Sequence, residues 1–249
     1  MDTKSSFLYI GHRGTRTIYD ENTIKAFKKA INFGANYIEF DVRKTRDGEI
    51  IVLHDSTLDR TTTGSGRLIN YTYKELKKFR TKSQSYMIPR LFEVFEILRG
   101  KSQFVIEIKE NNLTDEILNI ANKHDLLNNC IFSGRSLKEL ERIKLRYPQV
   151  EICYNITKGL GYKIHDFLKY GKAKKLEMKP NLINLRSNLI TKEFIEVCKI
   201  NNIKSLAWDF LNYKNPISQI KACIKAGING ILFDDHRNIP IIKHWVDSS

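Results

Sequence analysis

The sequence predicts an α/β protein built as one closed (β/α)8 barrel, and three observations favour this fold class. Short apolar runs alternate with segments of helical spacing, which gives about eight βα units along the chain. The length of 249 residues is normal for such a barrel, which typically has about 250. No glycine-rich dinucleotide fingerprint follows any of the apolar runs, which counts against an open doubly wound sheet.

The predicted elements follow one another from the first strand to the last, with one irregular stretch. The predicted strands cover residues 7–10, 37–42, 49–53, 104–108, 130–132, 150–154, 182–185, 204–208 and 230–234. The predicted longer helices cover residues 24–33, 91–98, 115–123, 137–146, 164–170, 192–199 and 216–226. We find no linker or low-complexity tract, so residues 1–249 are expected to form a single domain with a small insertion at about 55–90.

The chain is strongly basic, with a net charge of +14 from 42 lysines and arginines and 28 acidic residues. This charge is compatible with nucleic acid, an anionic membrane or an anionic substrate. No basic block reaches the length of a binding tail, so a lysine-rich solvated surface is the favoured interpretation. We expect no nucleic-acid partner, and the sequence leaves the oligomeric state open.

Two observations concern membranes and cell compartment. No run approaches the roughly 18 apolar residues that span a bilayer, so no stable membrane insertion is expected. The first strand begins near Phe7, which leaves no room upstream for the apolar region of a signal peptide. The sequence therefore predicts a cytoplasmic protein.

The cysteines and four of the histidines match no functional motif. The four cysteines show no paired spacing and each sits in an apolar run, so buried thiols are predicted. The four histidines are predicted at the surface: His124, His165, His236 and His244.

Chemistry-bearing residues gather in the first quarter of the chain. His12 follows the first apolar run, and His54 ends the third. Glu39 and Asp41 are two positions apart on a strand, so their side chains point to the same face about 7 Å apart. Two histidines and a carboxylate pair in so short a span predict a metal-assisted acid–base site.

Further polar residues end or follow later strands, where functional residues of a barrel lie. Glu107 and Lys109 repeat the spacing of Glu39 and Asp41, and Trp208 and Asp234 end two other strands. Three carboxylates at one barrel mouth repel each other unless a cation joins them. Because all the ligands are oxygen atoms, the expected ion is a hard divalent cation, Mg²⁺ or Ca²⁺.

Each of these residues also has a structural interpretation that the sequence leaves open. Glu39 and Asp41 can form a plain salt-bridge network with Arg13 and Arg43. A lysine such as Lys109 is usually solvated, and a tryptophan such as Trp208 often belongs to a barrel core. An aspartate such as Asp234 can simply cap the loop that follows it.

An ordered set of motifs resembles the glycerophosphodiester phosphodiesterase family, densely over residues 8–110 and more thinly afterwards. The matching segments are His12-Arg13-Gly14, Glu21-Asn22-Thr23, Glu39-x-Asp41, His54-Asp55, Leu58-Asp59-Arg60-Thr61-Thr62, Ile88-Pro89 and Glu107-x-Lys109. The chain departs from the family pattern at Asp20, where a proline is usual, and at Asp209, where threonine is usual. It also carries Phe233-Asp234-Asp235-His236 in place of a Thr-Asp-x-Pro pattern.

The resemblance implies a fold, an activity and a set of residue roles. It implies a TIM-type barrel that uses a divalent metal to hydrolyse glycerophosphodiesters to an alcohol and glycerol 3-phosphate. The implied roles are acid–base catalysis for His12 and His54, metal binding for Glu39, Asp41 and Glu107, phosphate contacts for Arg13 and Lys109, and a glycerol-side wall for Trp208. The residues alone do not say which histidine is the acid, nor whether water or a substrate hydroxyl attacks.

Two other functions remain compatible with the sequence. One is a lipid phosphodiesterase of the lysophospholipase D or sphingomyelinase D kind, which uses the same barrel. The other is a non-catalytic protein that binds phosphodiesters, whose affinity would weaken steeply with salt. We expect small water-soluble substrates, because residues 55–89 read as polar and offer no apolar run for an acyl chain. The aromatic residues of this stretch, Tyr71, Tyr73, Phe79 and Tyr86, are expected to pin it to the barrel.

Overall fold

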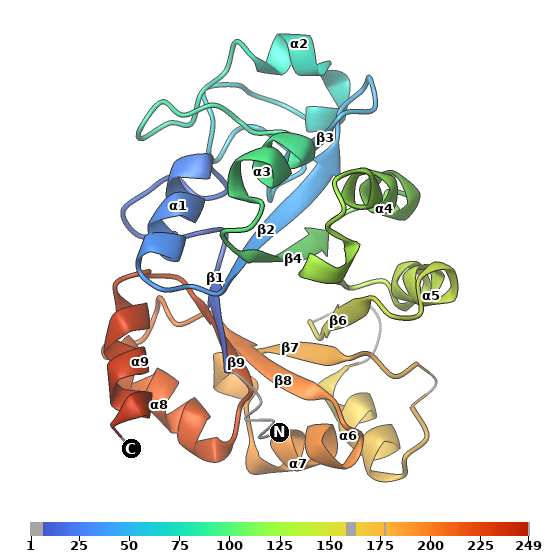
Figure 1. The fold of residues 1–249 in the computed structure, drawn as a ribbon, viewed down its shortest axis with the longest axis vertical. Helices are drawn as coiled ribbons and strands as arrows, with labels where there is room; N and C mark the ends of the chain where they lie inside the picture. The colour runs from blue at the N-terminus through green and yellow to red at the C-terminus, as the bar shows by residue number, and fades with distance from the viewer. Residues whose placement is uncertain (1–6, 158–162, 177, 249) are drawn as a thin grey trace.

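The computed structural model describes residues 7–157, 163–176 and 178–248, and these form the predicted closed barrel (Figure 1). Neighbouring barrel strands are parallel, and β1 closes the ring because it pairs with both β9 and β2. The barrel strands are β1 (Leu8–Gly11), β2 (Tyr37–Lys44), β4 (Gln103–Ile108), β5 (Cys130–Gly134), β6 (Glu151–Asn155), β7 (Leu182–Arg186), β8 (Lys204–Trp208) and β9 (Gly230–Phe233).

Helices surround the ring of strands, as parallel strands joined by crossover connections require (Figure 1). They are α1 (Ile24–Asn32), α2 (Tyr73–Leu76), α3 (Leu91–Leu98), α4 (Thr114–Lys123), α5 (Leu137–Arg146), α6 (Ile164–Lys172), α7 (Lys192–Ile200), α8 (Pro216–Ala226) and α9 (Asn238–Asp247). Side-chain caps fix several of their starts: Thr23, Ser136 and Thr191 each accept a hydrogen bond from a backbone N–H of the first turn.

Strand β2 is longer than the predicted residues 37–42, because it continues to Lys44. Its last residues, Val42 to Lys44, pair antiparallel with β3 (Ile50–Val52), so the two form a hairpin that extends beyond the ring. Asp41 therefore lies within a strand rather than at its end. The hairpin holds the start of the following segment, and hence His54, over the barrel mouth.

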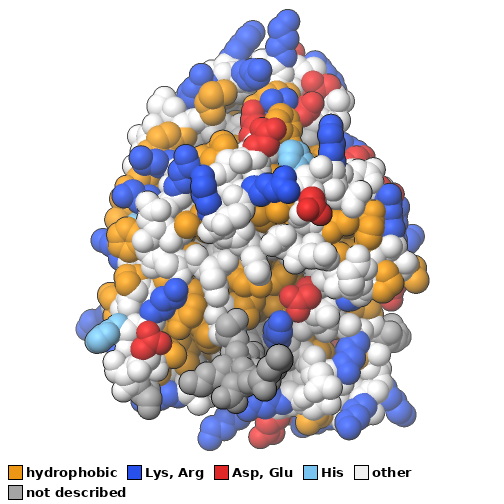
Figure 2. All heavy atoms as spheres, in the orientation of Figure 1, with side chains coloured by type: hydrophobic (Ala, Val, Ile, Leu, Met, Phe, Trp, Pro, Cys, Tyr) orange, Lys and Arg blue, Asp and Glu red, His pale blue; other side chains and the backbone are white. Residues whose placement is uncertain are grey.

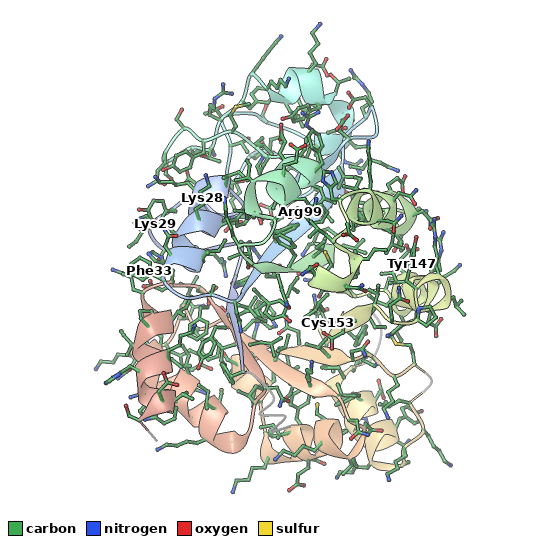
Figure 3. All side chains as sticks on the ribbon, in the orientation of Figure 1. Lys28, Lys29, Phe33, Arg99, Tyr147 and Cys153 are labelled. Carbon is green, nitrogen blue, oxygen red and sulfur yellow. The ribbon has the colours of Figure 1, made fainter. Side chains whose placement is uncertain are left out.

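Apolar side chains fill two separate spaces. The larger cluster lies between the strands and the helices and includes Phe27, Phe40, Phe104 and Phe132. The smaller one fills the inside of the ring with the alternate side chains of the same strands, among them Ile10 and Cys153, and Figure 3 labels Cys153 on β6. All four cysteines are free and buried, as predicted.

The segment between β3 and α3 packs on a third cluster of its own. Leu58, Leu68, Tyr73 and Leu76 are all buried there, with Tyr71 and Phe79 partly buried against them. A capping box at Thr72 opens the short helix α2. Tyr71, Tyr73 and Phe79 therefore hold the insertion together, whereas Tyr86 is partly buried and lies outside this cluster.

On the face that Figure 2 shows, the charged side chains lie at the surface in contact with solvent. Basic and acidic side chains are interspersed there, and the exposed Lys28 on α1 belongs to the outer layer (Figures 2 and 3). Among the described residues, no helix is long and apolar enough to cross a membrane. One surface prediction is wrong: His236 is buried against the ring of Phe33 and bonds the Thr15 hydroxyl at 3.0 Å.

Candidate active site

Three carboxylates from two adjacent strands meet at the barrel mouth. Glu39 and Asp41 lie on β2, Glu107 lies on β4, and Asp41 and Glu107 are direct partners in the parallel register. One oxygen from each of the three groups lies within 4.8 Å of the others. The alternation of side chains along a strand produces this arrangement, as the sequence predicts.

Cationic and amide groups surround the buried Asp41 carboxylate. The Arg13 Nε atom is 3.3 Å from Asp41 Oδ2, and the Asn22 side-chain amide donates a 2.9 Å hydrogen bond to the same oxygen. The Lys109 ammonium lies 3.4 Å from Asp41 Oδ1 and 2.8 Å from Glu107 Oε1. Its side chain is only 8% exposed, so Lys109 is not the solvated residue that its type suggests.

A left-handed turn after β1 directs the Arg13 backbone toward the cluster. Arg13 and Gly14 both have positive φ values, 52° and 77°. Gly14 adopts this conformation without strain, and a Cβ atom there would lie 2.7 Å from the Ala26 backbone. As a result the Arg13 N–H donates a 2.8 Å hydrogen bond to Glu39 Oε2.

The pKa values of the neighbouring carboxylates Glu39 and Asp41 are shifted in opposite directions. Burial raises the pKa of Glu39, and the nearby charges of Asp41 and Glu107 raise it further. Burial also acts to raise the pKa of Asp41, but Arg13 and Lys109 outweigh it and lower this pKa below its usual range. The protein's own cations therefore stabilise the ionised form of Asp41 more than that of Glu39.

The donor set fits a hard divalent cation. All three groups offer carboxylate oxygens, the ligands that Mg²⁺ and Ca²⁺ prefer. Asp41 Oδ1 is buried and has no hydrogen-bond partner among the described residues, so it retains capacity to bind an ion. Burial and the neighbouring charges of Asp41 and Glu107 raise the pKa of Glu39, and a bound cation would oppose these effects.

His12 stands at the end of β1 with one ring nitrogen held by a carboxylate. Its Nδ1 atom is 2.7 Å from Asp234 Oδ1, and its Nε2 atom is 4.0 Å from Glu39 Oε2. Asp234 follows β9, the barrel neighbour of β1, and also accepts bonds from the Phe210 N–H and from Arg16. Burial acts to raise the pKa of Asp234, but His12 and these donors lower it to about 2.

His54 is held in the same way on the other side of the mouth. Its Nδ1 atom is 2.6 Å from Asp55 Oδ1, and its side chain is 27% exposed, so it is the more accessible histidine. Burial lowers the pKa of His54; the charge of Asp41 acts to raise it, and the cations Arg13 and Lys109 act to lower it. The imidazole is therefore neutral at physiological pH and available as a proton acceptor.

Both histidines carry their proton on Nδ1. The pKa of Asp234 is about 2, and that of Asp55 is lowered below its usual range by the hydrogen bonds of Arg60 and His54, against the effect of burial. Both carboxylates are therefore ionised at neutral pH and can only accept hydrogen bonds. Each therefore accepts a hydrogen bond from the Nδ1–H group of its histidine, and Nε2 is the ring nitrogen without that bond.

An ion-pair network links the two histidine–carboxylate pairs through Glu21. Arg60 contacts both Asp55 and Glu21, the latter at 2.7 Å. Arg16 lies 3.6 Å from Glu21 and 2.9 Å from Asp234. Arg60 and Arg13 outweigh the effect of burial and lower the pKa of Glu21 to about 2.

Trp208 forms part of the wall of the pocket and part of the barrel core. Its ring centroid lies 6.1 Å from that of His12, and the Arg186 guanidinium stacks on it at 4.9 Å. The side chain is half-buried against the cluster inside the ring. Both interpretations of this residue, pocket wall and barrel core, therefore hold.

The contacts of Arg13, Arg43 and Asp234 differ from those expected for a plain salt-bridge network. Arg13 does pair with Asp41, but Arg43 binds Glu110 at 2.7 Å instead of the carboxylate cluster, so the two arginines do not form one network around it. Asp234 contacts His12 directly and is more than a loop cap. The histidines, the three carboxylates, Lys109 and Trp208 all lie around one mouth, together with Arg13.

Sequence reasoning missed two arginines that support this site, Arg16 and Arg60. Neither lies on a strand, and each acts through a carboxylate rather than at the mouth. Arg60 does belong to one of the matched segments, five residues after Asp55, and this was the available signal. No pattern near Arg16 indicates a contact with a residue 218 positions away.

Comparison with known proteins agrees with the geometry. The chain is 33% identical over 240 residues to a glycerophosphodiester phosphodiesterase of Caldanaerobacter subterraneus subsp. tengcongensis, covering 92% of this chain and 94% of that protein. It superposes on the Thermotoga maritima glycerophosphodiester phosphodiesterase with a TM-score of 0.75 at 27% identity, covering 96% of this chain and 98% of that one.

A further solved structure shares the fold. An Oleispira antarctica phosphodiesterase, solved with its product sn-glycerol-3-phosphate, matches with a TM-score of 0.78 at 22% identity and 96% coverage of both chains. The model of the glycerophosphoryl diester phosphodiesterase family matches residues 12–237, which include every candidate site residue. On this match and the 33% identity, the chain belongs to the glycerophosphoryl diester phosphodiesterase family.

Proposed function

We propose that this chain hydrolyses glycerophosphodiesters to an alcohol and glycerol 3-phosphate, with the single barrel domain acting alone. The observation that supports this most is the placement of His12 and His54, each with a carboxylate on Nδ1, at the same mouth as three clustered carboxylates. The Oleispira antarctica relative, whose structure holds sn-glycerol-3-phosphate, agrees with this assignment.

We assign the acid–base steps to the Nε2 atoms of the two histidines. One histidine takes the proton of the attacking hydroxyl as the bond to phosphorus forms. The other enters the step as an imidazolium and gives its Nε2 proton to the departing alkoxide oxygen as the P–O bond breaks. His54 suits the acceptor role in the first step because its lowered pKa keeps it neutral. Asp55 and Asp234 stabilise the imidazolium that forms on each side.

Charge on the phosphoryl group is offset by the cations that line the pocket. Lys109 and the Arg13 guanidinium are both buried, so their attraction for a phosphoryl oxygen is weakly screened by water. Glu39, Asp41 and Glu107 would hold Mg²⁺ or Ca²⁺. When bound, the ion would supply further positive charge for the phosphoryl oxygens.

The decisive experiment is turnover of glycerophosphoethanolamine or glycerophosphocholine by the purified protein. Product glycerol 3-phosphate is measured in Mg²⁺, in Ca²⁺ and in excess chelator. We expect turnover with at least one of the ions and none in the chelator. Full activity in the chelator would refute the metal assignment, and no turnover in any condition would refute the function.

Small soluble substrates are favoured over lysolipids by the insertion. Most of its larger apolar side chains, such as Leu58, Leu68 and Leu76, pack into a buried cluster, whereas Ile69 and Met87 are exposed. A lipid enzyme needs an apolar surface at the mouth, because each buried CH₂ contributes about 0.8 kcal/mol. The test compares kcat/KM for glycerophosphoethanolamine with that for a lysophospholipid below its micelle concentration. A clear preference for the lysolipid would support a lysophospholipase D activity instead.

A further inference from the structure

A groove of about 710 Å³ opens beside the active site, between the segment that follows β4 and the segment that follows β5. Cavities of this size commonly hold small molecules. Glu107, Lys109 and Arg135 line both this groove and the pocket that contains the two histidines. The groove is therefore continuous with the candidate active site.

The groove lies on the other side of the mouth from Trp208. Glu107 and Arg135 belong to β4 and the end of β5, whereas Trp208 ends β8, with β6 and β7 between them in the ring. A phosphodiester extends in two directions from phosphorus. If its glycerol arm lies against Trp208, its other arm, the alcohol that leaves, points to the groove.

Most charged groups in the groove are already paired. Arg43 binds Glu110 at 2.7 Å, and the buried Glu139 accepts a hydrogen bond from the Thr114 hydroxyl. Arg135 differs from them. Its only ion-pair partner among the described residues is Glu107, at 3.9 Å, which is beyond hydrogen-bond distance.

Arg135 is joined in the groove by the start of helix α5. Ser136 is the N-cap of this ten-residue helix, and Leu137, its first residue, lines the groove. The first N–H groups of a helix have no intrahelical acceptor and carry partial positive charge. Ile108, Leu137 and Leu140 provide an apolar wall beside these donors, suited to a short carbon skeleton.

We propose that this groove binds the leaving alcohol and favours an alcohol that carries an anionic group, a carboxylate or a second phosphate. Arg135 is the specificity-determining residue, because its guanidinium can donate charge-assisted hydrogen bonds to that group. This assignment rests on the proposed hydrolysis of glycerophosphodiesters and specifies its substrate class.

The test uses two substrates that differ by one carboxylate, glycerophosphoserine and glycerophosphoethanolamine. We measure kcat/KM for both at one pH and one metal concentration, for the wild type, Arg135→Gln and Arg146→Gln. Arg146 lies on the same helix α5, is similarly exposed and does not line the groove. We expect the wild type to prefer the serine ester at least about fivefold. Arg135→Gln should lower the ratio of serine to ethanolamine ester by about tenfold, and Arg146→Gln should leave it unchanged.

A third substrate, glycerophosphoglycerophosphate, separates the two kinds of anion. A larger Arg135-dependent preference for it than for the serine ester would assign the groove to a second phosphate. Turnover of all three esters at similar rates, or an equal loss on all three in Arg135→Gln, would refute the groove assignment and leave the hydrolysis standing. Failure to hydrolyse any of them would refute the proposed function itself.

Discussion

Replacing Asp234 by asparagine tests the role of the histidine–carboxylate pair most directly. The change keeps the size of the side chain and removes the charge that lies 2.7 Å from His12 Nδ1. A hydrogen bond to a charged group contributes about 1.5–3 kcal/mol. If this contribution is made to the imidazolium in the transition state, its loss lowers kcat by about 10- to 150-fold, at 1.36 kcal/mol for each factor of ten.

The assay measures kcat and KM for glycerophosphoethanolamine, with circular dichroism and a thermal melt to verify folding. Asp235→Asn is the matched control, because Asp235 is the next residue and pairs with Arg237 on the surface instead of with His12. We expect the loss in kcat rather than in KM. A kcat for Asp234→Asn within about twofold of the wild-type value, in a folded protein, would show that the carboxylate does not assist His12.

Three other perturbations test separate parts of the site. His12→Ala and His54→Ala should each lower kcat by at least about 10²-fold in a folded protein, and near-native turnover of either would remove its acid–base role. Glu107→Gln should weaken Mg²⁺ or Ca²⁺ binding measured by calorimetry, because oxygen sites depend on ligand charge; unchanged affinity would exclude it as a ligand. Glu21 and Asp234 both have pKa values lowered to about 2, so the stability they contribute is complete above about pH 4.5 and is lost as the pH falls toward 2. Urea unfolding from pH 5 to pH 2 should show this loss, and Glu21→Gln should reduce its slope.

Much of the fold could be predicted because buried parallel strands leave a plain signal. Runs such as that of residues 130–132 are apolar on both faces, and eight strands between helical patterns leave few arrangements other than a barrel. The extension of β2 beyond Val42 was not predicted. Residues Val42 to Lys44 are extended because they pair with β3, and this pairing depends on the turn at Asp47-Gly48 and not on their own composition.

The residues that face the mouth could be predicted from the sequence, whereas the arginines behind them could not. Glu39, Asp41 and Glu107 follow the two-residue period of a strand, so the sequence alone places them on one face. Arg16 and Arg60 lie in loops and reach their partners through the tertiary fold. The burial of His236 is also a tertiary effect, since the ring that packs on it belongs to Phe33 at the other end of the chain.

The carboxylates around the barrel mouth outnumber the cationic side chains that contact them. Contacts of 3.6 Å or less connect the charged groups around the mouth: the carboxylates Glu21, Glu39, Asp41, Asp55, Glu107 and Asp234, and the cations Arg13, Arg16, Arg60 and Lys109. Six carboxylates therefore face four cationic side chains in this set, so carboxylates are in excess. Arg135, half-exposed and 3.9 Å from Glu107, lies outside this set.

The shortage of cationic partners is greatest at Glu39. The side chain of Glu39 accepts a hydrogen bond from the Arg13 backbone N–H but has no cationic side chain within 3.6 Å among the described residues. Burial and the charges of Asp41 and Glu107 raise its pKa. Its neighbour Asp41 has Arg13 and Lys109 beside it and stays ionised. Ionisation of Glu39 and binding of a divalent cation are therefore linked, because each makes the other more favourable. The same linkage explains how three carboxylates can be buried side by side without an equal number of arginines or lysines.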